Sequence, residues 1–116
     1  MSEIEKLLES GADVNTSDKN DFTLLMSFVE KGDIETVKIL LRYGANVSVK
    51  DYFHFTALDY AIRKKHLKIA KLLVSSGAII TNDSYMFAVE SNYKEMVDFF
   101  DTLDPNKHIF LKNKLK

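Results

Sequence analysis

One short phrase recurs along the chain at a fixed interval. Each copy places a pair of leucines a few residues before a glycine, and the copies are "LLESGADVN" at 7–15, "LLRYGANVS" at 40–48 and "LLVSSGAII" at 72–80. Gly11, Gly44 and Gly77 follow one another at intervals of 33 residues, as do Thr23 and Thr56. A fixed period of this size predicts a solenoid of stacked units.

Residues 23–50 show how one unit is built. We expect Thr23 to cap a short helix over 24–31 through its hydroxyl, and Gly32 to end that helix in the left-handed conformation. A second helix is predicted over 34–42, since its apolar residues recur at spacings of three and four. They are Ile34, Val37, Leu40 and Leu41.

The rest of the unit is too short and too polar for another helix. Residues 45–55 are therefore expected to reverse the chain as an extended finger, and the unit over 56–83 repeats the whole plan. One helical pair cannot bury its apolar stripe alone, whereas stacked copies cover one another.

These residues resemble the ankyrin repeat. "GDIETVKILLRYGANVS" at 32–48 matches the second half of the family pattern, and "TLLMSF" at 23–28 and "TALDYA" at 56–61 stand for its first helix. The resemblance covers nearly all of residues 1–103. It implies an all-α fold, an ankyrin-repeat solenoid of stacked helix-turn-helix units with short β-hairpin-like fingers.

Three positions of the family pattern are changed in both full units. Leu24 and Ala57 replace its Pro, Met26 and Asp59 replace its His, and Asp21 and His54 replace its finger Gly. We expect less ideal finger turns from the last change. Asp59, at a helix start, is interpreted as a cap rather than as an acid catalyst.

The period divides the chain into one domain over 1–103 and a tail over 104–116. The units are a partial one at 1–17, full ones at 18–50 and 51–82, and an atypical last one at 83–103. In that last unit, which has lost six finger residues, Asp83 is expected to cap the first helix. "HIFL" at 108–111 has three interpretations, namely a lid on the last unit, a docking segment or a partly ordered terminus.

Composition excludes several classes of function. The 116 residues carry a net charge of −1 and no Cys, which disfavours a nucleic-acid footprint, a disulfide framework and a thiolate site. The His residues are far apart in sequence, and we predict no metal, no cofactor and no catalytic residue. No apolar run approaches the roughly 20 residues of a membrane span. We expect a cytoplasmic protein, or one acting in host cytoplasm if it is a secreted microbial effector.

The resemblance implies a concave binding surface made by finger tips and first helices. The predicted protein-binding residues are Lys19, Asn20, Phe22, Tyr52, Phe53, Tyr60, Arg63 and Lys64, with Phe55, Phe87, Glu90 and Ser91 extending the surface. The stretch "DYFHF" at 51–55 is the sharpest local signal, since aromatic side chains are typical interface anchors. The alternative is that Phe22 and Phe55 pack under neighbouring helices.

A second stretch, "RKKHLKIAK" at 63–71, carries five positive charges and no acid. It is interpreted either as a patch for an acidic partner or as an ordinary solvated face. His66 within it matches an inter-helix His of the family and is expected to be structural.

The predicted function is a non-catalytic protein–protein interaction module with a protein partner that the sequence does not identify, and with no nucleic acid or membrane partner. An enzyme is disfavoured because a thin two-layer solenoid rarely encloses a pocket. The alternative is a self-assembling or degraded remnant of a longer array. In that case a weak homodimer would form through the N-terminal half-repeat, where Ile4, Leu7 and Leu8 have no first helix to cover them.

Overall fold

The computed structural model describes residues 2–104 and residue 106. The tail segment at 108–111 therefore lies outside the described residues. Seven helices make up the described part, namely α1 (Glu3–Glu9), α2 (Leu24–Lys31), α3 (Ile34–Arg42), α4 (Ala57–Arg63), α5 (Leu67–Ser75), α6 (Asn82–Glu90) and α7 (Lys94–Leu103). No regular strand occurs among these residues.

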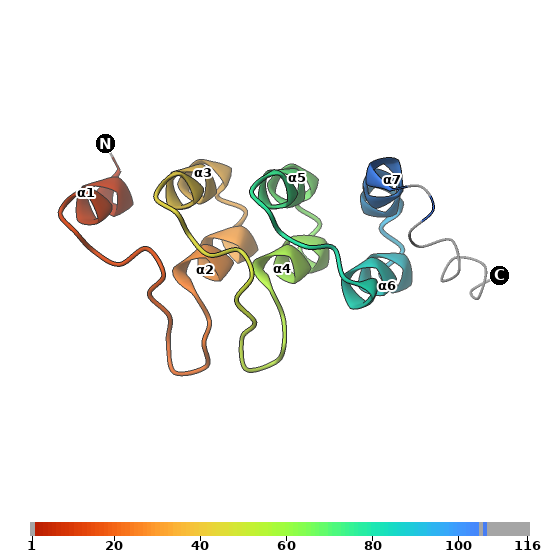
Figure 1. Ribbon diagram of the computed structural model, residues 1–116, viewed down its shortest axis with the longest axis horizontal. Coiled ribbons are helices and arrows are strands. Elements are labelled where there is room, and N and C mark those ends of the chain that lie inside the picture. The colour runs from red at the N-terminus through yellow and green to blue at the C-terminus, as the bar shows by residue number, and fades with distance from the viewer. Residues whose placement is uncertain (1, 105, 107–116) are drawn as a thin grey trace.

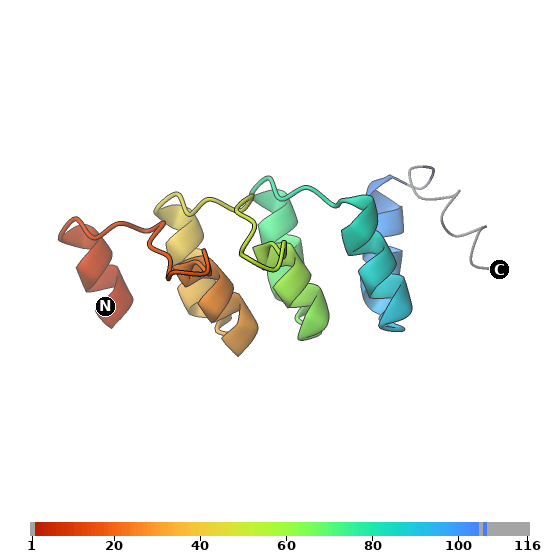
Figure 2. The ribbon, with the colours of Figure 1, turned by 90° about the horizontal axis from the view of Figure 1, so that it is seen from below.

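The helices stand in two rows (Figure 1). One row contains α2, α4 and α6, and the other contains α1, α3, α5 and α7. Seen from below, the helices of successive units lie side by side along the long axis (Figure 2), and the molecule measures 52 × 26 × 20 Å. The predicted all-α solenoid of helix-turn-helix units is confirmed.

Threonine side chains begin the helices of the first row. The N–H of Met26 donates to Thr23 Oγ1 at 3.1 Å, and the N–H of Asp59 donates to Thr56 Oγ1 at 3.3 Å. The last unit differs from its prediction, because α6 is capped by Thr81. Asp83 already lies inside its first turn, so its expected role as the cap was wrong. Thr81 is the last extended residue before α6. It lies two residues before the cap position that the alignment with the other units implies.

The recurrent glycine ends three helices of the second row, α1, α3 and α5. Gly44 has φ +86°, and the N–H of Ala45 returns to the carbonyl of Leu40 at 3.0 Å. Ala12 and Ala78 make the same bond to Leu7 and Leu73. This closure needs a residue in the left-handed conformation, which glycine adopts without a Cβ penalty. The repeated phrase is thus the end of a helix together with a leucine pair, of which Leu8, Leu40 and Leu73 are buried.

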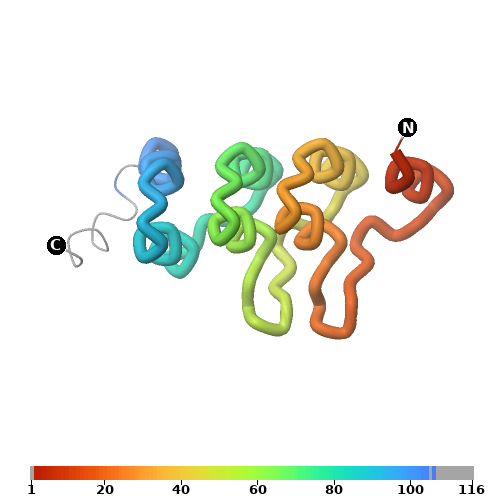
Figure 3. The backbone as a smooth tube through the Cα atoms, turned by 180° about the vertical axis from the view of Figure 1, so that it is seen from behind, coloured from red at the N-terminus to blue at the C-terminus, as the bar shows by residue number. Residues whose placement is uncertain are grey.

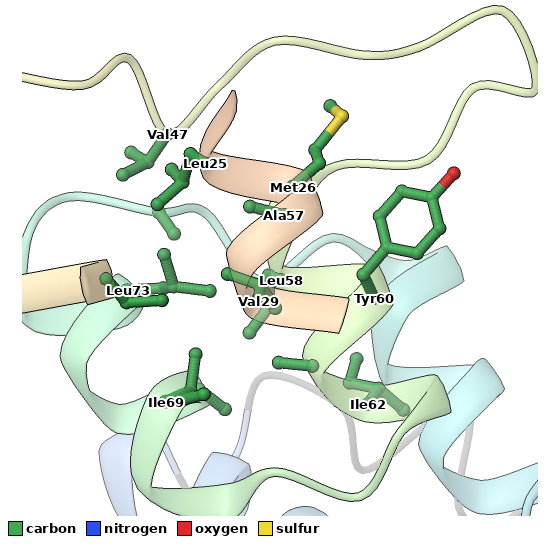
Figure 4. Close-up of a cluster of buried hydrophobic side chains, with 14 of the residues drawn as sticks. Leu25, Met26, Val29, Val47, Ala57, Leu58, Tyr60, Ile62, Ile69 and Leu73 are labelled. Carbon is green, nitrogen blue, oxygen red and sulfur yellow. The ribbon is translucent and has the colours of Figure 1, made fainter. Parts of the chain in front are cut away.

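The core lies between the two rows. Figure 4 shows apolar side chains from α2, α4 and α5 converging on one cluster. Leu58, Leu73 and Leu40 are completely buried, as is Val37. At the edges of the expected stripe, Ile34 and Leu41 are only partly buried.

Two fingers project from one edge of the array, one between α1 and α2 and one between α3 and α4 (Figure 3). Their turns place Asp21 at φ +59° and His54 at φ +66°, so these residues adopt the conformation that the family's glycine would favour. The first finger carries a single antiparallel bridge, Ser17 to Thr23, within the described chain. The connection to α6 is short and projects no finger (Figure 1), in line with the six finger residues that this unit has lost.

Candidate protein-binding surface

A buried carboxylate holds the second finger in shape. Asp51, 4% exposed, accepts the N–H groups of Phe53 at 2.9 Å and Phe55 at 3.0 Å through Oδ1. Its own N–H donates to the carbonyl of Phe55 at 2.9 Å. Apart from the Asp51 carboxylate itself, these bonds use only backbone groups of the finger, so they fix its path without involving the side chains at its tip.

The first finger is built in the same way. Asp18 Oδ1 accepts the N–H groups of Asn20 at 2.8 Å and Phe22 at 3.1 Å. The two fingers also bond to each other, since the N–H of Tyr52 donates to the carbonyl of Asn20 at 2.8 Å. The fingers therefore form one continuous surface rather than two independent loops.

Tyr60 ties the second finger to α4. Its ring is 5% exposed, and its hydroxyl donates to Asp51 Oδ2. Burial raises the pKa of Tyr60 above its ordinary value, and the hydrogen bond and charge of Asp51, together with the charge of Glu30, act in the same direction. The structure thus places Tyr60 beneath the predicted surface, where it supports the finger, while its neighbour Arg63 is exposed.

Four aromatic rings form a row from the first finger to α6. Tyr60 makes edge contacts with Phe22 at 5.4 Å and with Phe55 at 5.6 Å between ring centroids. Phe55 stacks on Phe87 at 6.3 Å. Phe22 and Phe55 are both half-buried, so each ring packs against its neighbours and keeps part of its area open.

The exposed aromatics stand at the tip of the second finger. Tyr52 is 70% exposed and Phe53 is 63% exposed, and their rings touch edge to face at 5.4 Å. Lys19, Asn20 and Lys64 of the predicted set are also exposed.

A shallow hollow of about 350 Å³, which we call the finger pocket, lies between the two fingers, α2 and α4. Its aromatic lining is Phe22, Phe53, Phe55 and Tyr60, and its remaining lining is Asp18, Asn20, Glu30, Asp51 and Arg63. Five of the eight predicted residues thus meet in one place, whereas Lys19, Tyr52 and Lys64 lie outside the lining.

Sequence reasoning missed the acidic part of this pocket. Asp18 and Asp51 are 33 residues apart, and so are Glu30 and Arg63, so the repeat period itself contained the signal. In the described chain, neither Glu30 nor Arg63 takes part in an ion pair or a side-chain hydrogen bond. Both therefore keep their charge available at the rim.

The basic stretch is divided between two places: Arg63 ends α4 and Lys64 and Lys65 follow it in the turn, whereas Lys68 and Lys71 lie on α5 in the opposite row. Lys38, Lys68 and Lys71 line a wide hollow between α3 and α5. His66 lies instead against the preceding unit, because a Cβ placed on Gly32 would come within 2.7 Å of the His66 ring. This contact agrees with the expected structural role of His66.

Asp59 acts as the expected cap. Its Oδ2 accepts the N–H of Thr56 at 3.0 Å, and its Oδ1 accepts the hydroxyl of Ser84 at 2.6 Å. Both carboxylate oxygens are thus engaged in holding helices α4 and α6.

Residues 2–104 and 106 contain no cluster of three or more His, Cys, Asp or Glu side chains arranged to hold a metal ion. Within the same residues, no helix has the length and apolar character needed to cross a membrane.

The comparisons with known proteins agree with the repeat. A family model described as ankyrin repeats, in three copies, matches residues 2–84. A sequence search of curated proteins finds no match. The matched region contains both fingers, the whole of the finger pocket and the helices from α1 to α5.

Proposed function

Because the chain belongs to the ankyrin repeat family, whose members are generally protein–protein interaction modules, we propose that it is a non-catalytic module that binds a protein partner. The binding surface is the one formed by the two fingers and the exposed side of α2, α4 and α6.

The exposed pair Tyr52 and Phe53 carries this proposal. A large aromatic side chain that is 63% or 70% exposed gains apolar burial only when something covers it. The finger beneath the pair is already fixed by Asp51. Binding therefore loses little conformational entropy through ordering of this loop. Pre-organised aromatic side chains of this kind are frequent hot spots of interfaces.

Site-specific crosslinking tests the location. Benzoyl-phenylalanine is introduced in place of Phe53 in one sample and in place of Ser75, an exposed residue at the end of α5, in another. After irradiation in a lysate of the cells that make the protein, we expect a discrete crosslinked product from position 53 only. Equal products from both positions, or none from position 53, contradict the proposed surface.

A matched pair of alanine substitutions tests how much the Phe53 side chain contributes to the free energy of binding. Phe53→Ala and Ile79→Ala remove side chains of similar exposure, 63% and 69%, so both should leave the circular dichroism spectrum and the melting temperature unchanged. We expect Phe53→Ala to weaken capture of the crosslinked protein by at least about tenfold, the loss typical of a hot spot. A similar effect of Ile79→Ala would mean that the surface lies elsewhere.

Self-association through α1 is the second candidate. Leu7 is 50% exposed on this helix, while an ion pair of Glu5 with Arg42, at 2.7 Å, joins the opposite side of α1 to α3. Sedimentation at increasing concentration should show a dimer that Leu7→Glu abolishes. A monomer at all concentrations removes this candidate and leaves the finger surface unaffected.

A further inference from the structure

We infer that the finger pocket receives one lysine or arginine side chain of the protein partner. This inference rests on the proposed function and adds the chemistry of the contact to it.

The shape and lining of the pocket suit a long side chain with an apolar stem. Phe22 and Phe55 approach from the bases of the two fingers and Phe53 from a tip, around a space of about 350 Å³. The methylene groups of a lysine or arginine can pack on these rings while the cationic end stays near water at the rim. A cation near the face of an aromatic ring is also attracted by the ring itself.

The charges around the pocket favour a cation. Three carboxylates, Asp18, Glu30 and Asp51, line it against the single guanidinium of Arg63. Asp51 already accepts three hydrogen bonds, and Asp18 accepts two through one oxygen. Glu30, which has no ion pair or hydrogen bond within residues 2–104, and the second carboxylate oxygen of Asp18 are left as the groups that a bound cation would meet directly.

An acidic side chain would enter the same pocket at a disadvantage, since it would face all three carboxylates with only Arg63 to attract it. A neutral apolar side chain would make the ring contacts but would leave Glu30 without a partner. Charge complementarity at an interface selects partners in this way, mainly by rejecting like charges.

A set of short peptides tests the inference without knowledge of the partner. The probes are blocked Gly-Gly-Xaa-Gly-Gly peptides in which Xaa is Lys, Arg, norleucine or Glu, added to the full chain labelled with ¹⁵N. We expect the Lys and Arg peptides to move the amide resonances of Glu30, Phe53 and Phe55. Norleucine has nearly the length of lysine without its charge and should move them less, and Glu should leave them unchanged.

Three single substitutions test which charged side chain determines the affinity for the Lys peptide. Glu30→Gln should weaken binding of the Lys peptide by up to about fivefold, the size of an exposed ion pair. Arg63→Gln removes a repelling charge and should leave binding equal or tighter. Glu9→Gln is the matched control, because Glu9 is an exposed glutamate at the end of α1, in the opposite row of helices, and lies outside the pocket lining.

Each outcome decides the question. Equal shifts from norleucine and lysine, or tighter binding of the Glu peptide, would overturn the inference, as would an equal loss in Glu30→Gln and Glu9→Gln. An absence of shifts with all four peptides would overturn it as well. The crosslink from position 53 can still appear in any of these cases, so failure of the pocket chemistry is distinguishable from failure of the binding surface.

Discussion

At the scale of single residues, one position shows how the units differ while keeping the same backbone. The left-handed residue in the turn that follows each first-row helix is Gly32, Lys65 or Asn92, with φ of +75°, +60° and +57°. In all three units the next N–H returns to a carbonyl of the preceding helix, at 2.9 to 3.1 Å. The left-handed conformation is required by this closure, and only Gly32 adopts it without strain.

Replacing Lys65 with glycine should therefore stabilise the protein. We expect Lys65→Gly to raise the free energy of unfolding by about 1 kcal/mol, since the left-handed penalty of a residue with a Cβ is removed. The control is Lys64→Gly, at φ −91°, which should lower that free energy by roughly 0.5–1 kcal/mol because it only adds chain entropy. Urea unfolding of both variants measures the difference, and equal destabilisation would refute it.

The buried tyrosines predict a loss of stability in alkali. Burial and a neighbouring aspartate raise the pKa of Tyr60, through Asp51, and of Tyr85, through Asp101, above the ordinary value. The folded state then keeps these protons while the unfolded chain releases them, so stability is full below pH ~10 and falls above it.

Each such tyrosine should lower the free energy of unfolding by up to about 1.4 kcal/mol per pH unit above pH ~10. Urea unfolding between pH ~9 and ~11 measures the slope. Tyr60→Phe should make the decline shallower, and Tyr52→Phe, at a 70% exposed position, serves as the control. A decline of the same slope in wild type and Tyr60→Phe would contradict the assignment.

At the scale of helices, stability depends on contacts between units as much as within them. Ser84 of α6 donates to Asp59 of α4, and Asp59 in turn accepts the N–H of Thr56. Asp59 stands where the family has a histidine, and it links the caps of two successive first-row helices.

A double-mutant cycle isolates this link. We expect Ser84→Ala to cost about 1.5–3 kcal/mol in the wild-type background, as for a hydrogen bond to a charged group. It should cost at least about 0.5 kcal/mol less in the Asp59→Ala background, because the acceptor is already gone. Thermal unfolding of the four proteins supplies the values. Additive effects would show that the two caps act independently.

The recurrent leucine of the second helix provides a second prediction at this scale. Leu40 is completely buried, and Leu40→Ala should cost roughly 2–5 kcal/mol through lost burial and the cavity that remains. Leu7→Ala, at the equivalent place of the first unit, is 50% exposed and should change stability by less than about 0.5 kcal/mol. Chemical unfolding compares them. A loss below about 1 kcal/mol at Leu40 would contradict its place in the core.

At the scale of the whole molecule, the helices in the middle of the array pack against more neighbours than those at its ends. Helix α4 packs against α2, α5 and α6, whereas α1 contributes one residue, Leu8, to the buried core. In a solenoid each unit contacts only its neighbours, so opening is expected to begin where neighbours are missing.

Native-state hydrogen exchange should report this gradient. We expect the amides of α4 to exchange more slowly than those of α1 by several orders of magnitude, because α1 can open alone while α4 requires the opening of the centre. Leu40→Ala should bring the exchange rates of α4 and α1 closer together, because it destabilises the central helices. Uniform protection from α1 to α5 would indicate that the array unfolds in one step.

The sequence was informative wherever the fold depends on the period. The helices over 24–31 and 34–42, the threonine caps and the glycine ends follow from spacing and local backbone chemistry, and the structure confirms them. The cap of α6 was mispredicted because the shortened connection moves the start of that helix, which an alignment of side chains does not register.

The candidate surface was less accessible to sequence reasoning. The burial of Tyr60 and the acidic lining of the finger pocket arise from contacts between a finger and a neighbouring helix. A repeat pattern gives the position of each residue within its own unit, and it carries no information on which side chains meet across units.

The way Asp18 and Asp51 secure the fingers has a consequence for how such a chain can evolve. Both aspartates accept hydrogen bonds from main-chain N–H groups. These bonds do not depend on which side chains stand at positions 19, 52 and 53. Mutation at these tips is thereby uncoupled from selection for a stable fold. Under the proposed function, single substitutions at the tips can therefore exchange one partner for another while the two aspartates keep the fingers in shape.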